Sequence, residues 1–329
     1  MNMAEERIVR AIEHHRRKYR DEVPTRQFVE RELHIKQQLW EKKVRQPVET
    51  LRSFIKQRVK SIEVNEQHLI LTLHDQRRYY VDDADYYAIT YNLLREGRDH
   101  ELYETAIREL VQPGDTVLDL GANYGYYTIL FSNVVGEKGQ VHAFEPNQRT
   151  FTELSEHLSL NESENVSAYN VAVSNQAKEE TLFFLDESRA RASLRMQNEH
   201  ADHVQSTRCV ALDSFFKEAD LKRLTCMKID VEGAELLCIE GAQQTIRQHS
   251  PVLLLEVCEA HLLQFGASAH ALLEKLSDWD YVFFEMVQGS IVQVEPGVVT
   301  QRSSMSDLVC IRQGTDRWKE RLTRFARQT

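Results

Sequence analysis

Apolar residues recur with two different spacings along the first hundred residues. Over residues 1–60 they return every three or four positions, most regularly at 47–59, which is the spacing of amphipathic helices. Over residues 61–100 the period shortens to two, as in strands with one buried face, and a short helical segment follows at 86–94. We therefore expect a helical arm, then a small antiparallel β segment that leads into the rest of the chain.

Beyond residue 100 short apolar runs alternate with helical segments. Strands are expected at residues 116–120, 140–144, 166–173, 181–185, 227–231, 252–257, 281–286 and 308–311. Helices are expected at residues 101–110, 126–134, 149–160, 235–248 and 268–278. This alternation is typical of an α/β domain with a doubly wound sheet, whose ligands bind at the carboxyl ends of central strands. We place that domain at residues 101–315 and a tail at 316–329.

Charge is divided unevenly between the arm and the body. Residues 1–60 hold 16 of the 41 basic and 9 of the 51 acidic side chains, a balance of +7, which leaves −17 for residues 61–329. An acidic body argues against a nucleic-acid enzyme, so no nucleic-acid partner is predicted. The arm's helices need a partner surface, and the candidates are the protein's own body, a second copy in a homo-oligomer, or an anionic membrane touched peripherally.

The chain carries no signal for export or for spanning a bilayer. No apolar run approaches the roughly 18 residues that a membrane helix needs, and charges at Glu5, Glu6 and Arg7 occupy the place of a secretory core. Five scattered cysteines are too few for a disulfide framework and are expected to be reduced. A cytoplasmic location is the expectation, with peripheral membrane contact left open by the basic arm.

The strongest local signal is a glycine turn between a buried strand and a helix. Gly121, Ala122, Asn123, Tyr124 and Gly125 follow an apolar strand, and free N–H groups at the start of the next helix face the turn. This is a cradle for a nucleotide-type ligand. A dinucleotide site would need a second glycine at the position of Asn123, so a pyrophosphate is disfavoured.

Two acidic residues refine the choice of ligand. Asp119, just before the turn, would repel a pyrophosphate but suits the cationic end of an amino acid. Glu145 ends the second strand, before Pro146, and its two oxygens are placed to accept both ribose hydroxyls. Adenosine joined to an amino acid, S-adenosylmethionine, satisfies both; the alternative is that these are solvated acids at strand ends.

Several segments together resemble the FkbM family of S-adenosylmethionine-dependent methyltransferases. The resemblance runs in order over residues 100–290, and its most specific part is Lys-Ile-Asp-Val-Glu-Gly-Ala-Glu at 228–235. The other matching segments are residues 114–123, 144–146, 170–174, 212–213 and 254–256. The first 60 residues lie outside it.

The resemblance implies a seven-stranded class I methyltransferase sheet, mostly parallel with an antiparallel last strand, and methyl transfer usually to oxygen. It implies that the turn around Asn123 holds the methionine part and Glu145 the ribose. It further implies that Ala172 and Val173 border the adenine, and that Glu104 lies near the cofactor pocket.

Candidate groups for proton removal lie at or near the ends of the strands expected at 227–231 and 252–257. Asp230 and Glu256 would meet at the ligand crevice, where one could act as base or both could hold a divalent metal; a structural role is the third option. Glu232 is a further candidate, although it and Glu235 could simply stabilise a helix N-terminus. His261 is either a second base or an ordinary surface histidine.

An arginine-rich segment is the candidate for binding the acceptor. Arg189, Arg191 and Arg195 suit a phosphate, sulfate or carboxylate, unless they form only a solvated loop. Together with these residues, the family resemblance implies an O-methyltransferase that acts on a hydroxyl of a small-molecule or glycan acceptor, such as a sugar in a natural-product glycoside. The alternative is a scaffold protein whose arm oligomerises and whose body only binds cofactor.

Overall fold

A computed structural model describes residues 59–64, 69–81, 98–184, 192–193, 203–287, 290–299 and 305–315. The chain divides into two compact units, residues 1–61 and 62–329, and the account below concerns the second unit. The predicted arm before residue 59, the predicted helix at 86–94 and the tail at 316–329 lie outside the described residues. Val59 and Lys60, expected at the end of an arm helix, instead begin a strand.

The centre of the body is an eight-stranded sheet, with the order β14-β13-β15-β12-β11-β4-β5-β6. Neighbours from β6 to β12 run parallel, whereas β15 is antiparallel to both β12 and β13. The strands are β4 (Thr116–Leu120), β5 (Gln140–Phe144), β6 (Val166–Tyr169), β11 (Cys226–Ile229), β12 (Val252–Val257), β13 (Tyr281–Val287), β14 (Ser290–Val294) and β15 (Ser306–Arg312).

The predicted antiparallel last strand is confirmed as β15, but the number of strands was wrong. The expected seven are joined by β14, which pairs antiparallel with β13 at the edge of the sheet. β14 is a half-exposed strand that follows β13 almost directly, so it lacks the apolar run that revealed the buried strands.

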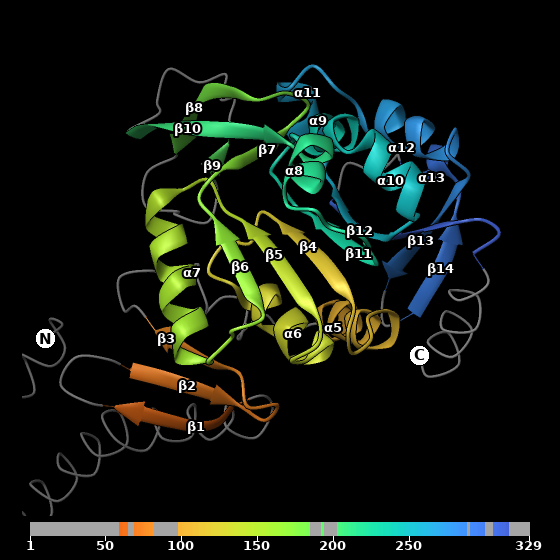
Figure 1. Cartoon of the computed structure of the whole chain (residues 1–329). Helices are drawn as coiled ribbons and strands as arrows, with labels where there is room; N and C mark the ends of the chain where they lie inside the picture. Colours follow the sequence, from red (N-terminus) through yellow and green to blue (C-terminus); the bar gives the residue numbers. More distant parts are fainter. Residues whose placement is uncertain are drawn as a thin grey trace, which may run out of the picture. The chain divides into compact units, whose positions relative to one another are not determined.

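Helices cover both faces of this sheet, because successive strand residues point to opposite sides (Figure 1). Val117 packs toward α5 and α6, while Leu118 packs in the cluster of α8, α9, α10 and α12. The helices are α5 (Arg98–Leu110), α6 (Tyr126–Val135), α7 (Gln148–Leu160), α8 (Leu212–Glu218), α9 (Glu235–Gly241), α10 (Gln243–His249), α11 (Glu259–Gln264), α12 (Ala269–Ser277) and α13 (Pro296–Val299). The helix expected over 235–248 is divided at Ala242 into α9 and α10.

A second sheet lies beside the carboxyl ends of the central strands, and its extent was not predicted (Figure 1). Its order is β7-β10-β8-β9, from β7 (Ala172–Ser174), β8 (Lys178–Phe184), β9 (Ala192–Ser193) and β10 (His203–Ala211). The single strand expected at 166–173 is therefore two strands in two sheets. Asn170 lies at the break, where its side-chain amide donates to the backbone oxygens of Glu145 and Pro146.

The third sheet precedes the central sheet in sequence. β1 (Val59–Val64), β2 (Leu69–Leu73) and β3 (Arg78–Val81) lie in that order, and the predicted antiparallel pairing is confirmed for β2 and β3. Tyr79 of β3 is completely buried. No helix within the described ranges is long and apolar enough to cross a membrane.

Candidate active site

The glycine turn connects β4 to α6 at the point where the strand order reverses. β5 and β6 continue the sheet on one side of β4, and β11 and β12 on the other, which leaves a crevice at their carboxyl ends. A Cβ on Gly121 would lie 1.8 Å from the carbonyl oxygen of Asp230. Only glycine fits there, because the backbone also has φ of 76°.

Glu145 fixes the other side of the turn. Its side chain is buried, and its two carboxylate oxygens accept the N–H groups of Asn123 and Asn147, each at 2.9 Å. Burial raises the pKa of Glu145 to about 7, although the two N–H donors oppose this shift. Each oxygen keeps a further lone pair, so the carboxylate can still accept hydroxyl donors from a ligand.

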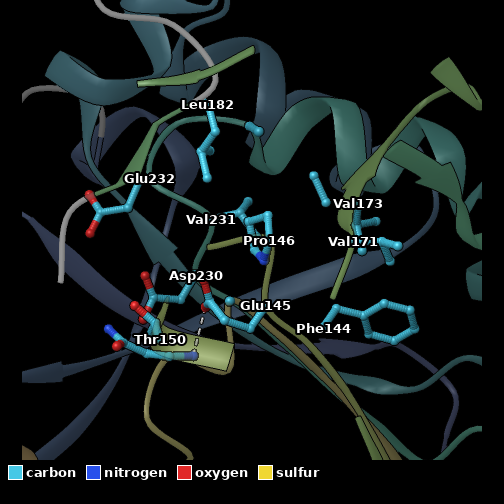
Figure 2. A pocket seen from close by; sticks show the side chains of 14 residues that line it. Phe144, Glu145, Pro146, Thr150, Val171, Val173, Leu182, Asp230, Val231 and Glu232 are labelled. Carbon is cyan, nitrogen blue, oxygen red and sulfur yellow. Dashed lines mark hydrogen bonds between the residues drawn. The ribbon is translucent and has the colours of Figure 1, made fainter. Parts of the chain in front are cut away.

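A cavity of about 710 Å³, counting the part open to solvent, lies over the turn. Figure 2 shows the carboxylates of Asp230 and Glu232 on one side of it, and Phe144, Val171 and Val173 on the other. One end therefore suits a polar or cationic group and the other an apolar or aromatic group.

Several residues predicted to contact the cofactor do line this cavity. They are Gly121, Asn123, Glu145, Pro146, Ala172, Val173 and Asp230. Ala122, Tyr124 and Gly125 belong to the turn but do not line the cavity, so their part would be to shape it. Their predicted contacts with cofactor remain predictions.

Asp119 is buried beneath the turn and does not face the cavity. Its carboxylate accepts the hydroxyl of Thr128 at 2.6 Å and lies 3.8 Å from the ammonium of Lys228. Burial raises the pKa of Asp119, while Lys228 and Thr128 oppose the shift. The structure thus places Asp119 as a support of the turn rather than at its ligand-facing surface.

Glu104 lies on α5, away from the cavity that the resemblance implied for it. Its carboxylate pairs with the guanidinium of Arg77 at 2.8 Å and accepts the hydroxyl of Tyr126. The residue is therefore one shell removed from the turn, in contact with the first residue of α6. Its link to the region beside the turn is thus through the Tyr126 hydroxyl, at the start of α6.

Lys228 joins the acids below and beside the turn. Its ammonium lies 3.0 Å from Asp230, 3.8 Å from Asp119 and 5.4 Å from the ring centroid of Tyr127. Burial alone would lower the pKa of Lys228, but the two carboxylates outweigh burial and raise it. A buried lysine is thereby kept charged, and it orients the Asp230 carboxylate at the cavity wall.

Glu256 lies near the end of β12, the strand next to β11, and Asp230 directly follows β11. The two residues therefore lie at the carboxyl ends of neighbouring strands, as expected. The register partner of Glu256 on β15 is Asp307. Burial, together with the negative charges of Asp230 and Asp307, raises the pKa of Glu256 well above its ordinary value. Glu256 makes no hydrogen bond or ion pair with a described residue, unlike Asp230, and it lies beside the cavity rather than in its lining.

Glu232 and Glu235 have different surroundings. Glu235 is buried and accepts the N–H groups of Gly233 and Val231 at 3.0 and 3.3 Å, so it holds the turn before α9. Glu232 instead lines the cavity with a left-handed backbone of φ 53°. Its carboxylate lies 3.2 Å from Nδ1 of His261. These two candidates therefore meet at the cavity's edge.

Two expectations, a possible divalent metal at Asp230 and Glu256 and acceptor binding by the arginine-rich segment, stay predictions. Among the described residues, no group of three or more His, Cys, Asp or Glu side chains is arranged to hold a metal ion. Arg189, Arg191 and Arg195 lie outside the described ranges.

Sequence reasoning missed other residues of the cavity wall. They are Phe144, Thr150, Val171, Leu182, Val231 and Ala234, with Glu232 expected only as a catalytic candidate. The buried hydroxyl of Thr150 has no hydrogen-bond partner among the residues that the structure describes, and it lies in the first turn of α7, five residues beyond Glu145. That short spacing was an available signal; Leu182 comes from the unpredicted second sheet and had none.

The strand order, the reversal at β4 and the glycine turn beside an acid at the end of β5 define a class I S-adenosylmethionine-dependent methyltransferase. The methyltransferase FkbM domain matches residues 119–283, half of the chain, and the chain belongs to this family.

Known proteins share this region at low identity. "Methyltransferase 1" of Beauveria bassiana (strain ARSEF 2860) is 24% identical over 167 residues, which is 45% of this chain and 67% of that protein. An rRNA methylase from Streptococcus thermophilus is 12% identical with a TM-score of 0.39, covering 66% of this chain and 98% of its own. A SAM-dependent methyltransferase from Aquifex aeolicus is 15% identical with a TM-score of 0.37, covering 66% and 95%.

Proposed function

We propose that this protein transfers the methyl group of S-adenosylmethionine to a hydroxyl oxygen of a sugar in a glycan or natural-product glycoside. The observation that carries the oxygen acceptor is the pair Asp230 and Glu256, two carboxylates at the ends of neighbouring central strands beside the cavity. A hydroxyl must lose its proton as the oxygen attacks, and a carboxylate can take it. The sugar rests on family resemblance, because one fold serves many acceptors.

The cavity fits the cofactor in two places. Glu145 offers the ribose hydroxyls two oxygens already fixed by backbone N–H groups. The apolar wall, including Val171 and Val173, suits the adenine ring, and the turn at Gly121 leaves room for the backbone to approach the methionine part. Thr150 adds a buried hydroxyl that lacks a partner in the unliganded chain.

Glu256 is the better candidate for the proton acceptor. Asp230 is paired with Lys228 at 3.0 Å, which orients its carboxylate. Glu256 forms no ion pair with a cation among the described residues, and burial beside Asp230 and Asp307 raises its pKa, which makes its carboxylate a stronger base.

Bound S-adenosylmethionine supplies an electrophilic methyl group on sulfur. The acceptor oxygen forms a bond to that carbon, the carbon–sulfur bond breaks with its electron pair on sulfur, and the hydroxyl proton moves to Glu256. The residues of the turn hold the reacting groups in line, which supplies most of the rate. In this scheme the three arginines at 189, 191 and 195 bind an anionic group of the acceptor.

The test uses methyl-labelled S-adenosylmethionine with a panel of monosaccharides and glycosides, scored by label transfer and by the O-methyl product's mass. We expect E256Q to lower turnover by about 100-fold or more. Its affinity for S-adenosylhomocysteine, measured by calorimetry, should stay within about twofold. E240Q is the control, because Glu240 is half-buried and pairs with Lys275 outside the cavity.

Other outcomes would overturn parts of the proposal. Full activity in both E256Q and D230N would remove both carboxylates as bases, and loss of activity on chelation would favour a metal instead. Label transferred only to nitrogen would reject the hydroxyl acceptor. Binding of S-adenosylhomocysteine without methyl transfer to any acceptor would favour the scaffold alternative, and binding of NAD instead, titrated in parallel, would reject the cofactor.

A further inference from the structure

The glycine turn at residues 121–125 is held in place by a hairpin that precedes, in sequence, the residues matched by the family. This hairpin, residues 69–81, consists of β2, β3 and the bend between them. It reaches the turn region at two backbone oxygens, those of Tyr124 and Tyr126. Figure 1 shows β2 and β3 beside the end of α7, and two hydrogen bonds join Arg78 to Asn161 there, at 2.8 and 2.7 Å.

The first connection between the hairpin and the turn is made by hydrogen bonds of His157, a residue of α7. Its Nδ1 lies 2.8 Å from the carbonyl oxygen of Tyr124, and its Nε2 lies 3.1 Å from the backbone nitrogen of Tyr80. A carbonyl can only accept and an N–H can only donate. Nδ1 must therefore carry the hydrogen and Nε2 must accept, so both bonds form only with neutral histidine.

The surroundings of His157 favour that neutral form. The ring is buried, and burial lowers the pKa of His157. It stacks on Tyr80 with ring centroids 5.8 Å apart and meets the edge of Tyr79 at 5.6 Å. The imidazole is thus fixed by hairpin residues while it holds the turn.

The second connection is made by hydrogen bonds to Tyr126, the first residue of α6. The hydroxyl of Tyr79 donates to the Tyr126 carbonyl at 3.2 Å, and Nη1 of Arg77 lies 3.5 Å from the same oxygen. The Tyr79 and Tyr126 rings stack at 5.8 Å, and the Arg77 guanidinium lies 4.8 Å from the Tyr126 ring centroid. The start of α6 is therefore held at both its backbone and its side chain.

Arg77 is itself held in place by burial and by two ion pairs. Its side chain is 2% exposed, and its charge is balanced by Asp75 and Glu104, each at 2.8 Å. A buried arginine with two carboxylate partners is costly to disturb. The same arrangement accounts for Glu104, which also accepts the Tyr126 hydroxyl.

We propose that the hairpin of residues 69–81 is a positioning element for the cofactor turn, and that Tyr79, Arg77 and His157 set the turn's geometry for S-adenosylmethionine. None of the three lines the cavity, so they are positioning rather than catalytic residues. The inference rests on the proposed role of the turn as the cofactor site. It assigns a cofactor-binding role to a segment outside the family-matched residues.

The mildest test is Y79F, which removes one hydroxyl and keeps the stacked ring. Its matched control is Y281F, because Tyr281 is also buried and donates to a backbone carbonyl, that of Pro251, at 2.9 Å. We expect Y79F to weaken S-adenosylhomocysteine binding by about three- to tenfold, with Y281F unchanged and both melting temperatures lowered alike. Equal affinities for the two variants would overturn the proposal.

A second pair separates holding the turn from holding the hairpin. N161A removes both Asn161 bonds to Arg78 but leaves His157 on Tyr124, whereas H157A removes the contact with the turn itself. We expect H157A to weaken binding of S-adenosylhomocysteine by about tenfold or more, N161A by less than about twofold. H157Q, which carries an N–H donor and an oxygen acceptor, should recover part of the loss. Similar losses in H157A and N161A would contradict the proposal.

The two proposals fail differently. If E145A weakens S-adenosylhomocysteine binding while Y79F and H157A do not, only the positioning role is lost. If E145A and the hairpin variants all bind as the wild-type protein does, the assignment of this cavity to the cofactor is lost as well.

Discussion

At the scale of single residues, the site depends on carboxylates whose protonation differs from that of a solvated acid. Glu145 and Glu235 are both buried, and burial raises the pKa of each to about 7. Both accept backbone N–H groups, which limits the shift without abolishing it. Near neutral pH such groups exchange protons, and only Glu145 lines the cavity. Cofactor binding should therefore report the titration of Glu145.

We expect the affinity for S-adenosylhomocysteine to fall as the pH drops below about 7. The ribose hydroxyls would donate to the ionised Glu145, so protonation at its raised pKa competes with binding by up to about tenfold per pH unit. Calorimetry between pH 5.5 and 8 measures this. E145A should bind weakly at pH 8 while it stays folded, and it should lose the pH dependence. Wild-type affinity in E145A would reject the ribose assignment.

The raised pKa of Glu145 has the opposite effect on the stability of the unliganded fold, which decreases as the pH rises. Because the folded-state pKa of Glu145 lies above the ordinary value of 4.5, its contribution to stability is fully present below about pH 4.5. That contribution is lost as the pH rises toward 7. Glu235 acts in the same direction.

At the scale of elements, the apolar cavity wall depends on the close approach of helix α9 to strand β7. β7 provides Ala172 and Val173 to the cavity. Near the end of α9, a Cβ on Gly241 would lie 2.1 Å from the carbonyl oxygen of Ser174. The thiol of Cys238, in the same helix, lies 3.3 Å from the carbonyl oxygen of Val173. The position of the wall is thus set by how near the helix can come.

G241A should push α9 away from β7. We expect it to lower the free energy of unfolding by about 1–3 kcal/mol, the usual cost of overpacking, and to weaken S-adenosylhomocysteine binding. Urea unfolding and calorimetry measure the two effects. G297A is the control, because a Cβ there meets nothing within 4 Å, and it should be close to neutral. Equal stabilities for the two variants would show that the helix shifts without cost.

At the scale of the whole molecule, the basic arm and the acidic body belong to different units of the chain and have different predicted roles. The described residues that line the cavity lie between 121 and 234, which places all of them within the second unit. The hairpin that holds the turn also lies there. The arm's charge of +7 leaves its predicted partners, a second copy or an anionic membrane, as proposals.

Removal of residues 1–58 keeps β1 whole and tests the arm directly. We expect affinity for S-adenosylhomocysteine to stay within about twofold, since the described residues that line the cavity all belong to the second unit. Sedimentation of both forms shows whether the arm associates copies, and flotation with anionic vesicles shows whether it binds lipid. A large loss of cofactor affinity in a folded truncated protein would mean that the arm completes the site.

The buried centre of the fold could be read from the sequence almost residue by residue. β4, β5 and β12 have the predicted bounds, because a strand buried on both faces is a continuous apolar run. The glycine turn and Glu145 were found in the same way, since backbone approach requires glycine and strand ends require polar residues. Half-exposed elements such as β10 and β14 lack this constraint and were missed.

Only the tertiary structure decided the contacts between segments that are distant in the chain. The family resemblance placed Glu104 near the cofactor, whereas packing pairs Glu104 with Arg77. Packing also puts Lys228 between Asp119 and Asp230. The hairpin's hold on the turn likewise spans 47 residues between Tyr79 and Tyr126. Local pattern determines which residues are buried and which turns form, because these depend on neighbours in sequence. Pairing of buried charges depends on which strands and helices become neighbours in space.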